Sequence, residues 1–263
     1  MPRFSANLSN GMMFNEVPFL ERFGAAARAG FEAVEYVTPY EHPKETVAAE
    51  LKKHRLTQAL FNLPAGDWAK GERGIACHPN RIEEFRRSVA KAIDYAKALG
   101  CTRLNCLAGK GLPGVNPDLL RATFVDNLKY AARETQKAGI TLVAEAINPI
   151  DIPGFFLNTS KQAMAILDDV GSDNLFFQYD IYHMQRQEGE LAATLTRLMP
   201  RIRHIQFAGN PGRHEPDIGE INYPYLFDLI DRLGYDGWVG AEYGPRGRTE
   251  DGLGWFAARR GVA

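Results

Sequence analysis

Four polar side chains stand at the ends of apolar segments, and all four carry oxygen atoms that can bind a metal ion. Glu145 follows LVA, Asp180 follows FFQY, Gln206 follows HI, and Glu242 follows VGA. A carboxylate buried at the end of an apolar strand needs compensation, because an unpaired charge that loses its water is either destabilising or becomes protonated. Three carboxylates that face one another repel unless a cation lies between them. The four residues therefore predict a site for a divalent metal.

The ligand atoms narrow the choice of metal. Carboxylate and amide oxygens suit hard cations, so we expect Mg2+, with Mn2+ as the second candidate, and not a sulfur-rich zinc site. The alternative is that each side chain pairs with an Arg or Lys at its own strand end. Recurrence at four strand ends favours the metal site over four separate ion pairs.

Cationic and imidazole side chains follow one of these residues closely. Arg213 and His214 come a few positions after Gln206, and an arginine can grip a substrate carboxylate with two parallel hydrogen bonds. The alternative is an ion pair with Glu215 or Asp217 that only fixes the loop. We predict that Arg213 and His214 bind the substrate.

Two further histidines and one more glutamate lie near the predicted site. His183, three residues after Asp180, is predicted to hydrogen-bond a substrate hydroxyl or to orient a metal ligand. His204 lies two positions before Gln206 in the same strand candidate, so both side chains point to the same face of the strand. We expect His204 to be a hydrogen-bonded histidine of the core. Glu35 ends another strand candidate, and for it a structural hydrogen bond is at least as well supported as a substrate contact.

Eight short runs rich in apolar and β-branched residues alternate with helical patterns, which predicts parallel strands joined by helices. In one of the helical patterns, Phe85, Val89, Ala92 and Ala96 share a face over residues 81–99, and Gly100 ends it. The strand candidates are 3–7, 33–37, 57–62, 103–107, 141–145, 175–180, 202–207 and 238–242.

This alternation predicts an α/β fold in which residues 1–263 form one domain, a (β/α)8 TIM barrel. No Gly-rich dinucleotide-binding turn follows the first strand candidate, so a closed barrel is preferred to a doubly wound sheet. The carboxyl ends of barrel strands converge at one mouth, which brings the four polar strand ends together. The loop 64–80 follows a strand and either partly covers this mouth or only decorates the surface.

Charge and composition restrict the partners. Lys and Arg number 31 against 32 Asp and Glu, a net charge of −1, which disfavours nucleic acid and anionic membranes and favours small molecules. No apolar run reaches the ~18 residues of a membrane span, and the N-terminus lacks the apolar block of a secretory signal. Cys77, Cys101 and Cys106 form no CxxC pair, so we expect reduced thiols and a cytoplasmic location.

Five segments carry a resemblance to known proteins, and the last two contain its longest and most unusual stretches: ANLSNGMMFNEVPFLERFGAAARAGFEAVEY, LVAEAIN, FFQYDIYH, HIQFAGNPGRHEPDIGEINY and GAEYGPRGRTEDGLGWF. They resemble the hydroxypyruvate isomerase family, which includes 2-oxo-tetronate isomerases and belongs to the xylose-isomerase-like barrels. The resemblance covers nearly the whole chain. It implies that Glu145 and Glu242 transfer protons as well as binding the metal, and that Asp180 and Gln206 complete the metal shell.

The resemblance also implies a reaction. We expect a metal-dependent isomerase that converts hydroxypyruvate to 2-hydroxy-3-oxopropanoate, or a 2-oxo-tetronate to its 3-oxo isomer, through an enediolate. A homo-oligomer is expected at the level of the family. Three alternatives stay open: a sugar 3-epimerase using the same two carboxylates, an endonuclease-like barrel enzyme, and a non-catalytic barrel stabilised by metal. Only 6 His and the balanced charge disfavour the endonuclease.

Overall fold

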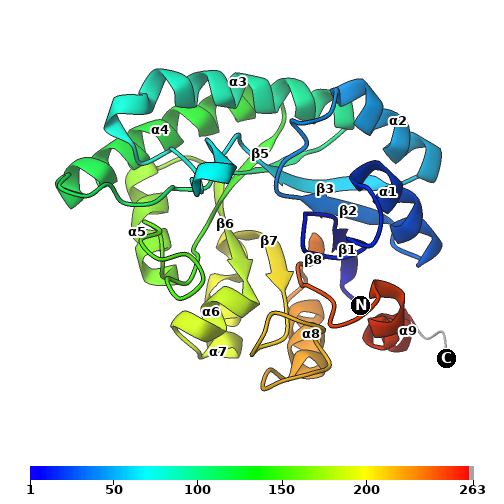
Figure 1. Ribbon diagram of the computed structural model, residues 1–263. Coiled ribbons are helices and arrows are strands. Elements are labelled where there is room, and N and C mark those ends of the chain that lie inside the picture. The colour runs from blue at the N-terminus through cyan, green and yellow to red at the C-terminus, as the bar shows by residue number, and fades with distance from the viewer. Residues whose placement is uncertain (261–263) are drawn as a thin grey trace.

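The computed structural model describes residues 1–260 as a closed barrel of parallel strands with helices around it (Figure 1). The strands follow one another around the barrel in sequence order, and the last pairs with the first. The predicted (β/α)8 barrel is therefore confirmed. The eight strands are β1 (Arg3–Asn7), β2 (Ala33–Tyr36), β3 (Thr57–Asn62), β4 (Arg103–Asn105), β5 (Thr141–Glu145), β6 (Leu175–Asp180), β7 (Ile202–Phe207) and β8 (Trp238–Ala241).

Three strands end one or two residues earlier than the patterns predicted. β2 ends at Tyr36, β4 at Asn105 and β8 at Ala241. Backbone pairing continues past the end of β8, since Glu242 N donates to Phe207 O at 3.0 Å. The difference is one of boundary, and it leaves Glu242 at the carboxyl end of the strand.

Helices connect the strands and cover the outside of the barrel (Figure 1). The helix predicted over residues 81–99 is α3, and Gly100 ends it in the left-handed region with φ 63°. Two short helices follow β6. The helices are α1 (Phe19–Arg28), α2 (Lys44–His54), α3 (Ile82–Leu99), α4 (Pro117–Lys137), α5 (Ser160–Val170), α6 (Ile181–Gln187), α7 (Leu191–Leu198), α8 (Tyr223–Arg232) and α9 (Gly254–Arg260).

The barrel interior contains a buried polar cluster centred on Glu35. This carboxylate accepts hydrogen bonds from Ser5 Oγ and Gln206 Nε2, each at 2.7 Å, and lies 3.0 Å from His204 Nε2. Gly240 leaves the necessary room, because a Cβ there would lie 2.3 Å from Glu35 Oε1. Burial alone would raise the pKa of Glu35, but the charge and hydrogen bond of His204, with the other two hydrogen bonds, lower it on balance. Glu35 and His204 thus have the structural hydrogen bonds expected of them.

The apolar core lies between the strands and the helices. Phe4 of β1 packs edge-to-face against Phe207 of β7, Phe227 of α8 and Trp255 of α9, with ring centroids 5.0 to 5.8 Å apart. These contacts fasten the last helix over the point where the barrel closes. Across residues 1–260, the helices lack the combination of length and apolar character that crossing a membrane requires.

Candidate active site

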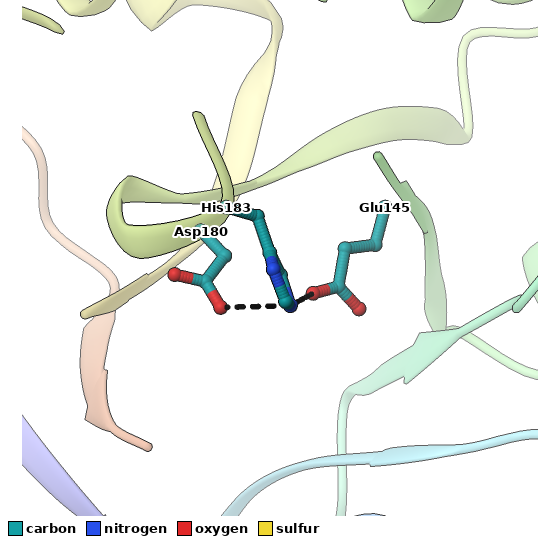
Figure 2. Close-up of side chains that lie close together, drawn as sticks. All are labelled: Glu145, Asp180 and His183. Carbon is teal, nitrogen blue, oxygen red and sulfur yellow. Dashed lines mark ion pairs between the residues drawn. The ribbon is translucent and has the colours of Figure 1, made fainter. Parts of the chain in front are cut away.

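Three side chains from β5, β6 and the start of α6 point toward one another at the barrel mouth (Figure 2). Glu145 is the last residue of β5, Asp180 is the last of β6, and His183 lies in the first turn of α6. His183 Nε2 lies 3.5 Å from Asp180 Oδ2 and 3.9 Å from Glu145 Oε1. All three residues are buried, and one ligand atom from each lies within 4.8 Å of the others. The carboxyl ends of these strands thus meet where barrel geometry requires.

The ring of His183 is oriented by Asn148. Asn148 Oδ1 accepts hydrogen bonds from the backbone N–H groups of Ile150 (3.1 Å) and Asp151 (2.9 Å), which identifies the oxygen end of the amide. Its Nδ2 therefore donates to His183 Nδ1, 2.7 Å away. Burial and the nearby charge of Arg213 keep the ring neutral by holding its pKa well below the usual value. In the neutral ring the proton is then on Nε2, which faces the carboxylates as a donor.

Arg213 connects the carboxylates at the ends of β6 and β8. Its Nη2 lies 2.8 Å from Glu242 Oε2 and 3.4 Å from Asp180 Oδ2. The backbone of Arg213 is in the left-handed region (φ 57°), and Gly244 N donates to its carbonyl oxygen at 3.0 Å. This bond ties the loop after β7 to the segment after β8, so the guanidinium is held between the two carboxylates.

The side chain of His214 contacts the segment after β8 and not the carboxylates that Arg213 contacts. Its Nδ1 is 2.7 Å from Gly244 O, so the ring braces the same two segments. It is not among the residues that line the pocket at the mouth. Arg213 lines this pocket and His214 does not, so a contact of His214 with the substrate stays a prediction.

Two asparagines hold the two glutamates, and neither was predicted from the sequence. Asn105 at the end of β4 donates from Nδ2 to Glu145 Oε2 at 3.0 Å, and Asn7 at the end of β1 donates to Glu242 Oε1 at 3.2 Å. Both stand at strand ends, as the four predicted residues do. Applying the strand-end argument to all eight strand candidates would have found Asn7, but not Asn105, because the predicted strand 103–107 runs two residues beyond the end of β4.

Gln206 neighbours Asp180 in the register of β6 and β7, but its amide is bonded inside the barrel. Its Nε2 donates to Glu35, and its Oε1 accepts a hydrogen bond from Gln178 Nε2. A carbonyl oxygen has two acceptor sites, so Oε1 retains one for a further partner.

Negative charge exceeds positive charge at the mouth. Burial raises the pKa of Glu145 well above its ordinary value, and the charges of Glu242 and Asp180 raise it further. Burial also raises the pKa of Asp180 to about 6 and that of Glu242 to about 8, although Arg213 opposes both shifts. One guanidinium thus compensates three buried carboxylates incompletely, which is the condition that favours uptake of another cation.

The mouth opens into a pocket of about 680 Å³. Glu145, Glu242 and Arg213 line it, and Trp68 and Arg73 reach it from the long loop after β3. Of the two interpretations of this loop, the one in which it contributes to the site is therefore supported. Trp68 and Arg73 were not predicted, because a loop has no repeating pattern that indicates which side chains face the pocket.

Comparison with known proteins identifies close relatives of the chain. Residues 23–259 match a family model described as a xylose isomerase-like TIM barrel. The hydroxypyruvate isomerase of Escherichia coli (strain K12) is 54% identical over 256 residues, which cover 97% of this chain and 98% of the relative. A 2-oxo-tetronate isomerase of Cupriavidus necator is 50% identical over 256 residues, with the same coverage of 97% and 98%.

Solved structures with the same fold carry more varied descriptions. One described as an AP endonuclease, family 2, from Brucella melitensis has a TM-score of 0.95 at 47% identity and covers 98% of this chain and 99% of its own. An L-ribulose 3-epimerase has a TM-score of 0.72 at 23% identity and covers 98% of this chain and 86% of its own. The second likeness is one of fold alone.

Proposed function

Because the chain belongs to the xylose isomerase-like TIM barrel family, we propose that it is an isomerase of small hydroxy-oxo acids that moves a proton between adjacent carbons. The substrate is hydroxypyruvate or a 2-oxo-tetronate, the compounds for which its relatives at 54% and 50% identity are named. One observation carries the proposal. Glu145 at the end of β5 and Glu242 just after β8 line one pocket, and both have raised pKa values, as groups that exchange protons near neutral pH require.

In the proposed reaction, one glutamate removes a proton from the hydroxyl-bearing carbon, and the substrate becomes an enediolate. The other glutamate delivers a proton to the former carbonyl carbon, while the hydroxyl proton passes to the former carbonyl oxygen. Hydroxypyruvate thereby becomes 2-hydroxy-3-oxopropanoate with no atom gained or lost. We assign His183 Nε2–H to the substrate oxygens, because a fixed donor stabilises the negative charge that develops there.

We further propose that the site binds a divalent cation, with Mg2+ first and Mn2+ second. The excess of buried carboxylates over guanidinium groups fits a divalent cation, and all the proposed ligand atoms are oxygens. A divalent cation bound there supplies polarisation of the substrate carbonyl and stabilisation of charge on its oxygens. His183 is not assigned to the shell, because Asn148 leaves the proton on Nε2. The proposed ligands are Glu145, Asp180, Gln206 and Glu242.

A cytoplasmic location completes the proposal. Cys77, Cys101 and Cys106 are buried free thiols, which suit a reducing compartment. Burial raises the pKa of Cys77 to about 12, so its thiol stays protonated near neutral pH.

The test is proton exchange with defined substrates. Purified protein with Mg2+ is mixed in D2O with hydroxypyruvate, 2-oxo-tetronates and ketoses, and NMR follows deuterium at the carbon next to the carbonyl. Isomerisation of an acid with deuterium incorporation is expected. Epimerisation of ketoses without turnover of any acid would favour a sugar 3-epimerase, and neither exchange nor isomerisation of any acid would contradict the proposal. Abasic duplex DNA serves as a control, because the Brucella structure is described as an endonuclease.

A further inference from the structure

Three arginines line the pocket at the mouth, and they differ in whether a carboxylate already pairs with them. Arg213 pairs with Glu242, and Arg186 pairs with Asp151. Arg73 forms no ion pair with any carboxylate in residues 1–260. Burial lowers the pKa of Arg73, and no neighbouring carboxylate opposes this effect. Arg73 is therefore the cationic group of the pocket whose charge is left for a ligand.

The hydrogen bonds of Arg73 leave one edge of its guanidinium open. Nη1 donates to Glu72 O at 2.6 Å and to Trp68 O at 3.2 Å. Nε and Nη2 form the side-on edge that matches the two oxygens of a carboxylate, and neither bonds to the described part of the chain. In Arg213 the same edge is not available, since Nη2 donates to Glu242 and Nε is buried.

The loop holds the backbone beside Arg73 in a fixed position. Gly74 N donates to Ala65 O at 2.8 Å, and Gly74 packs against the segment after β4. A Cβ at Gly74 would lie 2.3 Å from Leu107 O, and its φ of 107° also suits only glycine. Arg73 is thus presented from an anchored position, so little ordering is needed when a ligand binds.

The neighbours of Arg73 direct it toward the pocket. The adjacent acid, Glu72, pairs with Arg81 and not with Arg73. Trp68 stacks against the guanidinium, with Arg73 Cζ 3.7 Å from the ring centroid, which holds the plane of the group.

We propose that Arg73 binds the carboxylate of the acid substrate through its Nε–Nη2 edge, with Trp68 fixing the plane of the guanidinium. This inference rests on the proposed function, because only an acid substrate carries that carboxylate. The role first expected of Arg213 passes to Arg73, and Arg213 stays with Glu242. An acid held by Arg73 lies in the same pocket as Glu145 and Glu242, and a neutral ketose lacks this anchor.

Binding of an unreactive acid tests the site without requiring turnover. D-glycerate has the carboxylate and hydroxyls but no carbonyl to isomerise, and calorimetry in the presence of Mg2+ gives its Kd. We expect Arg73→Gln to raise this Kd roughly 30-fold and Arg73→Lys roughly 5-fold, because lysine keeps the charge but loses the paired donors. Lys70→Gln is the matched control, since Lys70 lies exposed on the same loop outside the pocket, and it should leave Kd unchanged.

The outcomes distinguish the proposed role of Arg73 from the proposed isomerase function. Arg73→Gln that binds D-glycerate as tightly as the unmodified protein, or an unmodified protein that does not bind it, overturns the role of Arg73. If the Arg73 variants lose D-glycerate binding but the unmodified protein isomerises no acid, the carboxylate site stands and the proposed function fails. If hydroxypyruvate is isomerised with the same KM by Arg73→Gln, the function stands and this inference fails. Arg73→Lys keeps the test valid should Arg73→Gln not fold.

Discussion

The two glutamates at the mouth have unequal surroundings. Glu242 has Arg213 Nη2 2.8 Å from one carboxylate oxygen and the amide of Asn7 3.2 Å from the other. Glu145 has the amide of Asn105 at 3.0 Å, and across residues 1–260 no arginine or lysine forms an ion pair with it. One carboxylate is thus held by a full positive charge and the other by neutral donors.

This difference affects how readily the carboxyl groups of Glu145 and Glu242 ionise. Burial raises both pKa values, but Arg213 opposes the rise for Glu242, whose pKa is about 8, more directly than for Glu145. The ion pair with Arg213 thus stabilises the ionised form of Glu242, whereas across residues 1–260 Glu145 has no arginine or lysine partner that would do the same. Because a base must be ionised and an acid protonated, the surroundings favour Glu242 as the group that first removes the substrate proton and Glu145 as the group that returns one.

Replacing the glutamates should give the largest effects and break the comparison most directly. Either Glu145→Gln or Glu242→Gln should lower kcat for isomerisation by ~10²–10⁴-fold, the range for lost acid–base catalysis. Glu145→Gln should still exchange the hydroxymethyl hydrogens of hydroxypyruvate with D2O, whereas Glu242→Gln should lose exchange as well. NMR measures both, with the exposed Glu250→Gln as the control. Exchange kept by Glu242→Gln and lost by Glu145→Gln would reverse the assignment.

Removing the positive charge should make the two glutamates alike. In Arg213→Gln, the pKa of Glu242 rises further, so at pH 7 less of the base is ionised and kcat/KM should fall by roughly 10²-fold. Because a raised pKa keeps the base protonated to higher pH, the acid limb of the pH–rate profile should move upward. Arg186→Gln removes a pocket arginine that pairs with Asp151 instead, and its acid limb should stay in place. An unmoved limb in Arg213→Gln would show that Glu242 does not depend on this charge.

The affinity for a metal ion should depend on pH because of the raised pKa values of the carboxyl groups at the mouth. Asp180, with a pKa of about 6, and Glu242, with a pKa of about 8, are protonated below these values, so a cation must displace protons there. Affinity for Mg2+ should therefore rise between pH 6 and pH 8, by ~10-fold per pH unit for each proton displaced. Calorimetry in buffers of different ionisation enthalpy counts the protons released. Equal affinity across this range, with no proton release, would contradict the proposed ligand set.

The sequence allowed the fold to be predicted because alternation of strands and helices repeats along the whole chain. It also placed Glu145, Asp180 and Glu242 at one mouth, since strand ends of a closed barrel converge. Strand alternation put Gln206 and His204 on one face correctly, and both reach Glu35. The depth of Gln206 in the barrel was not predictable, because alternation gives the face and not the partner.

The positions of the loop side chains could not be predicted from the sequence, for a different reason. Arg213 and His214 are adjacent, yet Arg213 contacts the carboxylates of Asp180 and Glu242 whereas His214 contacts Gly244 O. Asn148 orients a ring 35 residues away, and Arg73 reaches the pocket from a loop with no periodicity. Such contacts depend on turns and on tertiary packing, which local sequence patterns do not encode.

The smallest effects should come from the two asparagines, and they sharpen the comparison. Asn105→Ala removes the amide that holds Glu145, which has no arginine to replace it, so kcat should fall by roughly 10-fold. Asn7→Ala leaves Glu242 paired with Arg213, so its kcat should fall by less than about 3-fold. Steady-state kinetics at saturating Mg2+ measure both, and thermal unfolding is measured alongside because Asn7 also accepts a hydrogen bond from Ser9 N. An equal or larger loss in Asn7→Ala, at unchanged Tm, would mean that Arg213 holds Glu242 no better than an amide does, and the inequality between the two glutamates would then have no consequence for the reaction.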